Sequence, residues 1–352
     1  MKSTLLILVA ILSLSKASFG QNMYNQIDSI AKSTLLENAD LGIIIGFISN
    51  DVEYYTAYGK LGKDSQININ KNSIFEIASI TKIITANLIA QAALENKLQL
   101  SDYIDDYLPS EFVLHGNLQN KITISDLASH QSGLPDIDFR KLIEQDSQQP
   151  ISKVTEQSLA AIINNCHALI DHGQYRYSTM GYTLLGQILE TVYGKSYDEI
   201  IQEKIIAPLQ MTNTLTKDFA VSNKTNAYNP DGGTQELLKW NVTASAGLVK
   251  SSASDMITYL QELLNENSAI SQAAIMTEQI FYQDDNRELG LGTNIMLDGE
   301  NTIYLKSGDS MGQSSIICYN RVKKWGIVIL LNHRDSGMRQ NLLNEIYESV
   351  LK

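Results

Sequence analysis

The sequence is poor in the residues that build metal sites and disulfide frameworks. It contains two cysteines, Cys166 and Cys318, and five histidines, and it has no CxxC, HxxxH or HExxH pattern. These absences argue against a zinc site, and no cofactor is expected. The two cysteines lie far apart in apolar segments. Isolated thiols in such segments are more often buried than bridged, although an exported protein could pair them.

Positive charge is also scarce. The chain carries 27 Lys and Arg against 39 Asp and Glu, which gives a formal net charge of −12, and no basic cluster stands out. A nucleic-acid partner needs a concentrated positive surface, so this class of function is disfavoured.

No apolar run predicts a membrane span. The N-terminal run Leu5–Leu14 has ten residues, whereas a membrane helix needs about 20. It follows Lys2 and precedes Ser18-Phe19-Gly20, which places small residues where a signal peptidase cuts. This pattern predicts an export signal over residues 1–20, and an uncleaved anchor is the alternative. We expect an exported protein, periplasmic or secreted, with no stable membrane span after cleavage.

Strand patterns occur near both ends of the chain, and helical patterns lie between them. The stretches Leu41–Ser49 and Val52–Tyr58 are joined by Asn50-Asp51, which predicts a hairpin. A long apolar helix is predicted at Ser79–Lys97. Further strands are predicted at Leu289–Met296, Thr302–Leu305, Ser314–Tyr319 and Gly326–Leu331, and further helices at 21–37, 122–129, 158–164, 180–192, 197–206, 252–264 and 336–351.

These patterns predict an α+β fold. An antiparallel sheet built from both ends of the chain would be flanked by the N- and C-terminal helices, with a helical lobe inserted. The α/β lobe would comprise about residues 21–80 and 285–352, and the helical lobe about 81–284, within one domain of residues 21–352.

One serine and one lysine stand where such an apolar helix begins. In "FEIASITK" (Phe75–Lys82), Ser79 and Lys82 are three residues apart, so a helix places both side chains on one face. A helix N-terminus also favours the negative charge that a nucleophilic serine develops. The spacing alone is weak, because S-x-x-K occurs four times in this chain. Only Ser79 opens a buried helix after a loop.

Five stretches, in order, resemble the motifs of the serine β-lactamase and penicillin-binding protein superfamily. The resemblance is strongest to the branch of class C β-lactamases, D-alanyl-D-alanine carboxypeptidases and esterases, and it implies a β-lactamase-like fold. The five stretches are "FEIASITK", "ITISDLASHQSGLPD" (122–136), "GQYRYSTMGYTLLG" (173–186), "TASAGLVKSSASDM" (243–256) and "YLKSGDSMGQ" (304–313).

The resemblance implies four catalytic residues. Ser79 would be the acylated nucleophile, and Lys82 the neutral amine that shares or takes its proton. Tyr177 would relay a proton between Ser79, Lys82 and the leaving group. Lys306 would hold positive charge near Tyr177 and near a substrate carboxylate. Whether the lysine or the tyrosine is the working base stays open. For Lys306 alone, a solvated edge-strand lysine is the alternative.

Residues next to Lys306 are implied to bind substrate. Ser307 would hydrogen-bond a substrate carboxylate, and Gly308 would let the substrate approach the strand. The backbone amides of Ser79 and Asp309 would form the oxyanion hole.

The sequence departs from the family pattern at several positions. Thr179 stands where the second motif usually has Asn, whose amide contacts the lysine and the substrate, and this weakens the case for β-lactams. Asp309 puts an acid where a neutral residue is usual; it would point away from the pocket or repel anions. Asn332 and Arg334 lie where the class C branch binds a carboxylate, although "LLNHRD" fits a strand exit equally well. His130 is expected to pack or cap.

The function expected from this resemblance is an exported serine hydrolase. It would form an acyl-enzyme at Ser79 with a β-lactam, a D-alanine-type peptide of cell-wall origin or a carboxyl ester; Thr179 and Asp309 favour the last two. The alternatives are an impaired relative that binds peptidoglycan-like ligands or regulates an envelope partner, and an exported structural protein.

Overall fold

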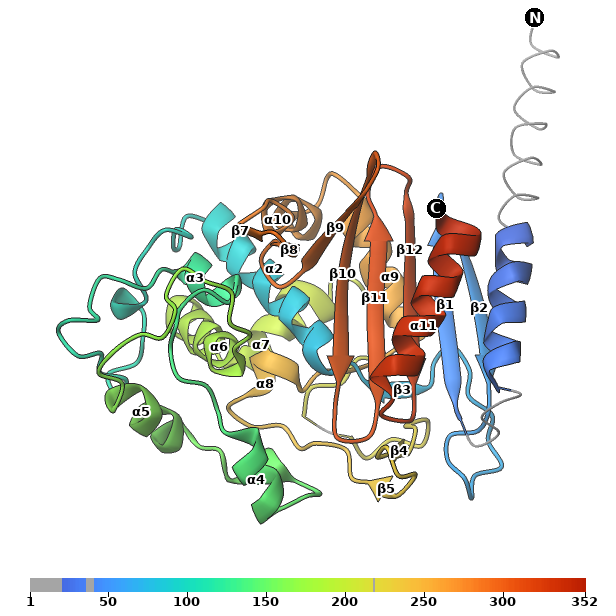
Figure 1. The fold of residues 1–352 in the computed structure, drawn as a ribbon, viewed down its shortest axis with the longest axis horizontal. Helices are drawn as coiled ribbons and strands as arrows, with labels where there is room; N and C mark the ends of the chain where they lie inside the picture. Colours follow the sequence, from blue (N-terminus) through green and yellow to red (C-terminus); the bar gives the residue numbers. More distant parts are fainter. Residues whose placement is uncertain (1–20, 36–40, 218) are drawn as a thin grey trace, which may run out of the picture.

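An eight-stranded antiparallel sheet forms one side of the molecule, and most of the helices lie on the opposite side of the molecule (Figure 1). The computed structural model describes residues 21–35, 41–217 and 219–352, so the predicted export signal lies outside the described residues. The strands follow the order β2-β1-β12-β11-β10-β9-β8-β7. Their bounds are β1 Ile43–Ser49, β2 Val52–Tyr58, β7 Tyr282–Asp284, β8 Arg287–Leu289, β9 Asn294–Asp298, β10 Asn301–Asp309, β11 Ser314–Asn320 and β12 Trp325–Leu331.

The predicted hairpin is present at the start of this sheet. Asn50 and Asp51 join β1 to β2, and both have positive φ, +48° and +66°. A two-residue hairpin turn of this kind favours Asn and Asp, which tolerate left-handed backbone better than other side chains. The predicted strand Leu289–Met296 is divided into β8 and β9 by a loop containing Gly292, whose φ of +74° ends the extended run.

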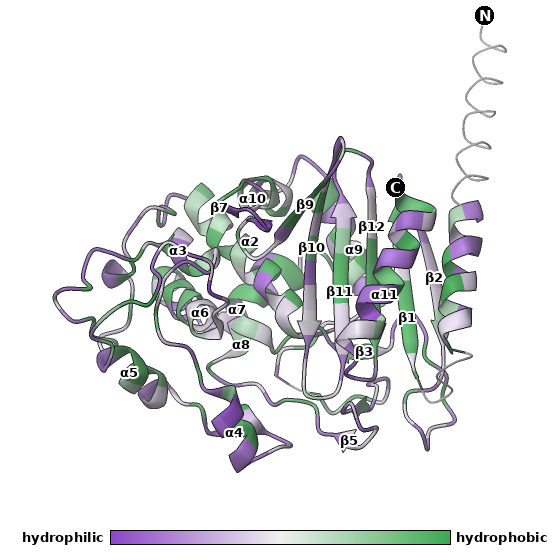
Figure 2. Ribbon diagram, viewed as in Figure 1, coloured by the Kyte–Doolittle hydropathy of each residue, from purple (hydrophilic) through white to green (hydrophobic). Residues whose placement is uncertain are grey.

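Two hydrophobic clusters cover the two faces of the sheet. The outer cluster joins Ile27 of the helix over residues 21–35 and Ile346 of α11 to Ile45 and Ile329 in the sheet. The inner cluster joins the opposite face to the central helices, with Ile257 of α9 packed against Gly46. Figure 2 shows apolar residues along the inner strands and on the sheet-facing helices. The antiparallel sheet flanked by terminal helices is thus confirmed.

The helices between β2 and β7 build the other side of the molecule. Their bounds are α2 Thr81–Leu94, α3 Ile124–Ala128, α4 Phe139–Gln145, α5 Glu156–Asn164, α6 Thr179–Tyr193, α7 Tyr197–Ile201, α8 Ala244–Gly247, α9 Ala253–Leu264 and α10 Ala269–Thr277, and α11 Ser336–Ile346 follows β12. The sequence patterns did not predict α4, α8 or α10. Two short pairs, β3 Ile74–Glu76 with β6 Lys250–Ser252 and β4 Ala227–Tyr228 with β5 Thr234–Gln235, complete the fold.

Both cysteines are buried and unpaired, and they belong to different hydrophobic clusters. Cys166 belongs to the inner cluster and Cys318 to the outer one, which keeps the two thiols apart. Burial raises the pKa of the Cys318 thiol, so it behaves as a small apolar side chain. Over residues 21–35, 41–217 and 219–352, no helix is long and apolar enough to cross a membrane.

Candidate active site

Ser79 lies on a tight turn between β3 and α2. The turn is the 3-10 helix Ala78–Ile80, and α2 begins at Thr81 rather than at Ser79 as predicted. Ala78 has a φ of +45°, an unusual conformation for a residue with a side chain. Strained backbone of this kind is frequently found at functional sites, where surrounding structure holds it in place. Here it precedes the nucleophile that the sequence predicts.

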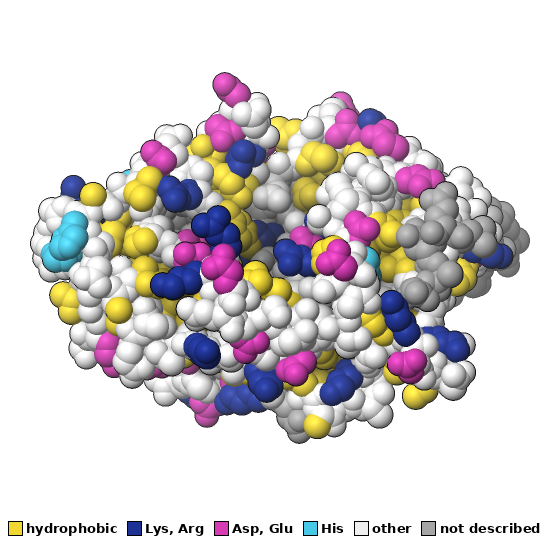
Figure 3. All heavy atoms as spheres, turned by 60° about the horizontal axis from the view of Figure 1, so that its bottom comes forward, with side chains coloured by type: hydrophobic (Ala, Val, Ile, Leu, Met, Phe, Trp, Pro, Cys, Tyr) yellow, Lys and Arg dark blue, Asp and Glu magenta, His cyan; other side chains and the backbone are white. Residues whose placement is uncertain are grey.

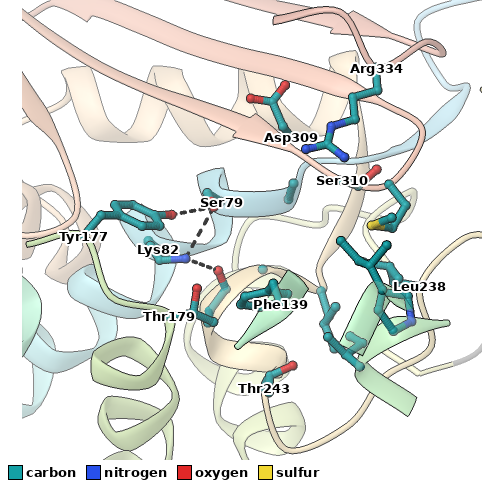
Figure 4. Close-up of a pocket in the computed structure, with 18 residues that line it drawn as sticks. Ser79, Lys82, Phe139, Tyr177, Thr179, Leu238, Thr243, Asp309, Ser310 and Arg334 are labelled. Carbon is teal, nitrogen blue, oxygen red and sulfur yellow. Dashed lines mark hydrogen bonds between the residues drawn. The ribbon is translucent and has the colours of Figure 1, made fainter. Parts of the chain in front are cut away.

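The structure brings Ser79, Lys82 and Tyr177 together (Figure 4). Ser79 Oγ lies 2.7 Å from the Tyr177 hydroxyl and 3.3 Å from Lys82 Nζ. Lys82 Nζ also donates to the backbone carbonyl of Ala246 in α8. Tyr177 comes from the segment just before α6, so two segments far apart in the chain meet at the Ser79 hydroxyl, and α8 contacts them through Lys82. These distances fit a nucleophile within reach of two proton acceptors.

Lys306 is the fourth member of this group. Its Nζ lies 5.0 Å from the centre of the Tyr177 ring, and Lys82 Nζ lies at the same distance from that centre. Lys306 is only 5% exposed, so it is not the solvated edge-strand lysine that was the alternative. Pairing with β9 ends at Leu305, so Lys306–Asp309 of β10 run past β9 beside the turn that carries Ser79.

Burial lowers the pKa of both lysines and so favours their neutral form. It lowers the pKa of Lys82 to about 7, against the opposing effect of the Asp136 carboxylate. It lowers the pKa of Lys306 to about 8, with Tyr177 acting against this shift and Lys82 adding to it. A desolvated ammonium is disfavoured, so a good fraction of Lys82 is an uncharged amine at neutral pH. Such an amine can accept a proton from Ser79.

We expect the rate of Ser79 acylation to rise as the pH increases through about 7. Lys82 loses its proton over this range, and only the neutral amine accepts the serine proton. Asp136 raises the pKa of Lys82, so Asp136→Asn should move the rising limb to lower pH. The measurement is kcat/KM for a neutral ester against pH, with Asp171→Asn, a change at an exposed acid, as the control. If the rising limb of Asp136→Asn stayed at the pH of the wild-type limb, the assignment of the limb to Lys82 would be contradicted.

Asp136 and His130 support the site, although the sequence did not single out Asp136 and gave His130 only a packing or capping role. The Asp136 carboxylate accepts hydrogen bonds from the backbone amides of Thr179 and Met180, and so caps α6. His130 Nδ1 accepts from the amide of Ser178, and its ring lies 4.5 Å from that of Tyr177. Burial and the two lysines lower the pKa of His130, so its ring stays neutral. These contacts fit the expectation that His130 packs or caps.

Gly308 lets the turn of Ser79 approach β10. A Cβ at this position would lie 2.3 Å from the Ile77 carbonyl oxygen and 3.0 Å from the Ser79 amide nitrogen. No side chain fits there, which explains glycine in this motif. The close approach places the Ser79 amide beside the strand that continues into Asp309, as an oxyanion hole would require.

The charge of Asp309 is balanced by an ion pair with Arg339 of α11. Its carboxylate lies 2.6 Å from Nη1 of Arg339 in α11 and accepts a hydrogen bond from Ser314 Oγ. Figure 4 shows the carboxylate directed away from Ser79. Of the two expectations for Asp309, the structure therefore supports the one in which the acid points away. Arg339, which is buried, also donates to the Gly308 carbonyl and was not predicted from sequence.

The side chain of Asn332, which was expected to bind substrate, is engaged within the fold. It is 1% exposed, and its Oδ1 accepts a hydrogen bond of 2.8 Å from the backbone amide of Gly42. This bond ties the exit of β12 to the start of β1, which fits the strand-exit interpretation, and a contact of Asn332 with substrate stays a prediction. Arg334, two residues later, lines the cavity around Ser79.

Thr179 and Ser307 differ in their access to the cavity. Thr179 lines it, but in the described part of the chain no hydrogen bond joins Thr179 to Lys82, whose amine bonds Ala246 instead. Ser307 is not among the described residues that line it. Its cross-strand partner Ile316 belongs to the outer cluster, so the register gives no support for a contact between Ser307 and substrate.

The cavity around Ser79 has a volume of about 250 Å³. Tyr177 is 40% exposed, so the site is open to substrate. Figure 3 shows the face of the molecule that lies below in Figure 1; there, basic and acidic side chains are interspersed and apolar ones reach the surface between them.

Similar proteins share the sequence pattern and the fold. A β-lactamase from Pseudomonas fluorescens is 23% identical over 87% of this chain and 92% of its own length. Protein flp from Staphylococcus aureus (strain COL) is 27% identical over 87% of this chain, and the match spans 62% of that relative's length. The solved structure of a class C β-lactamase superposes with a TM-score of 0.82, at 21% identity, over 94% of this chain and 96% of its own. A sequence profile of the β-lactamase family matches residues 38–351. The chain therefore belongs to the β-lactamase family of serine hydrolases.

Proposed function

We propose that the chain is an exported hydrolase that forms an acyl-enzyme at Ser79 with an ester or amide substrate. The observation that carries this proposal is the pair of contacts at Ser79 Oγ, 2.7 Å to the Tyr177 hydroxyl and 3.3 Å to Lys82 Nζ. Export rests on the signal pattern of residues 1–20.

The reaction begins with proton transfer from Ser79. Lys82 takes the proton, directly or through Tyr177, as Ser79 Oγ bonds to the carbonyl carbon. The amides of Ser79 and Asp309 stabilise the oxyanion. The bond to the leaving group breaks, and that group takes the proton through Tyr177. Water then releases the acyl group by the same steps in reverse.

Three substrate classes fit this chemistry: carboxyl esters, D-alanine-type peptides, including those derived from the cell wall, and β-lactams. The relatives named as β-lactamases favour the last. Thr179 favours the first two, because its short hydroxyl replaces an amide that would contact both the lysine and the substrate. Arg334 borders the cavity, and no ion pair holds it among the described residues, so it is available to a substrate anion.

A binding protein without turnover is the second candidate function, and Thr179 is the observation that favours it. The arrangement of Ser79, Lys82, Tyr177 and Lys306 argues against it, because a ligand-binding site has no need for two lysines with lowered pKa around one hydroxyl.

The intact mass of the protein after incubation with a fluorophosphonate, and separately with a penicillin, tests the proposal. We expect a mass increase of one adduct in the wild type and none in Ser79→Ala. A lasting penicillin adduct would indicate slow release of a β-lactam, and a fluorophosphonate adduct alone would favour an esterase or peptidase. No adduct with either reagent would favour the binding protein.

A further inference from the structure

The cavity at Ser79 has a wall of apolar side chains. The residues of this wall come from four segments: Phe139 and Ile143 of α4, Pro150 and Ile151 after it, Leu238, and Met311 after β10. Lining residues of this kind bind apolar groups, while a few polar groups fix the orientation of the ligand.

Helix α4 presents apolar residues that the protein itself buries only in part. Phe139 and Ile143 are four residues apart, so they share one face of α4, and that face lines the cavity. No residue of α4 is buried. When a ligand covers an apolar pair that is partly open to solvent, the free energy of the complex falls in proportion to the apolar area removed from water.

The Leu238 part of the wall is held by hydrogen bonds with buried charged side chains. Glu76 Oε1 accepts from the Leu238 amide at 2.6 Å, and Lys250 Nζ donates to the Leu238 carbonyl at 2.6 Å. Glu76 and Lys250 are 3% and 1% exposed, and they pair with one another at 3.5 Å. The amide of Gln149 also donates to the carbonyl of Leu237. Because these bonds hold the Leu238 backbone, this part of the apolar wall is in place before substrate binds, which lowers the entropic cost of binding.

The position of Tyr177 indicates which part of the substrate meets this wall. Figure 4 shows Tyr177 on one side of Ser79 and Leu238 on the other. The leaving group takes its proton through Tyr177, so it lies on the Tyr177 side. The acyl group, which stays bonded to Ser79, extends toward Leu238 and α4.

We propose that the substrates are carboxylic esters with an apolar acyl group of several carbon atoms. This inference rests on the acyl-enzyme proposed above. Ser79 Oγ bonds to the acyl carbon, the bond to the alcohol oxygen breaks, and the alcohol leaves with the serine proton. Water then cleaves the acyl-enzyme to a carboxylic acid and free Ser79. An ester needs no partner for an amide N–H, which suits Thr179 at its position.

A series of p-nitrophenyl esters tests the inference. We expect kcat/KM to rise by about three- to fourfold per added methylene from acetate through butyrate to hexanoate, and then to level off. In a second series, hexanoate esters of ethanol and butanol should differ little, because the alcohol does not touch the apolar wall.

Two variants connect the chain-length preference to α4. Phe139→Ala and Ile143→Ala should flatten the rise, so that the ratio of kcat/KM for hexanoate to kcat/KM for acetate falls toward one. Lys141→Ala, on the exposed side of the same helix, should keep the wild-type profile. Thermal unfolding confirms that all three variants fold.

The outcomes separate this inference from the acyl-enzyme proposal. Ser79-dependent turnover of acetate with a flat chain-length profile would overturn the apolar acyl site and leave the acyl-enzyme standing. A rise that persists in both α4 variants would do the same. Absence of Ser79-dependent turnover with every ester, together with no fluorophosphonate adduct, would overturn the acyl-enzyme proposal and this inference with it.

Discussion

The variant Lys82→Met is expected to acylate Ser79 about 10²- to 10⁴-fold more slowly than the wild type, the usual contribution of a general base. Methionine matches the length of the side chain but has no amine to accept the proton of Ser79, which lies 3.3 Å away. The measurement is the rate of fluorophosphonate labelling at constant pH. Lys121→Met, at an exposed position, is the control and should label at the wild-type rate.

The same variant should not lose stability. Burial lowers the pKa of Lys82 from 10.5 to about 7, so between these values the unfolded chain holds a proton that the folded chain has released. Stability gained from this group therefore increases with pH across that window. Lys82→Met removes this dependence and should unfold at an equal or higher temperature near neutral pH. If Lys82→Met were labelled at the wild-type rate and Tyr177→Phe were not labelled, Tyr177 would be the base instead.

The variant Lys250→Met is expected to destabilise the protein by about 3–5 kcal/mol, the typical cost of leaving one partner of a buried ion pair uncompensated. Glu76 would then lose its countercharge while its Oε2 already has no hydrogen-bond partner in the described chain. Urea unfolding measures the loss. Lys239→Met, an exposed change in the adjoining segment, should stay within about 0.5 kcal/mol of the wild type.

A double variant distinguishes lost charge pairing from lost packing. Glu76→Gln with Lys250→Met removes both charges but keeps an oxygen that accepts from the Leu238 amide. It should recover most of the lost stability, because no uncompensated charge remains. A double variant as unstable as Lys250→Met alone would show that packing around Lys250, and not the charge of Glu76, causes the loss.

The sequence alone determined the features that depend on neighbouring residues. Asn50-Asp51 predicts the hairpin because a two-residue turn with positive φ needs such side chains. The alternating and helical patterns predict an antiparallel sheet from both chain ends, since each period fixes which face is apolar. The five ordered motifs identified the family, and they placed Ser79, Lys82, Tyr177 and Lys306 in one site as an expectation.

The tertiary structure alone decided which side chains meet across the chain. Asn332 accepts a hydrogen bond from the Gly42 amide, and Asp309 pairs with Arg339 on the C-terminal helix. Among four S-x-x-K pairs, only packing brings Tyr177 to Ser79 and buries Lys82 enough to lower its pKa. Local patterns fix the direction of a strand or a helix face, but they carry no information about the partner that long-range packing places opposite.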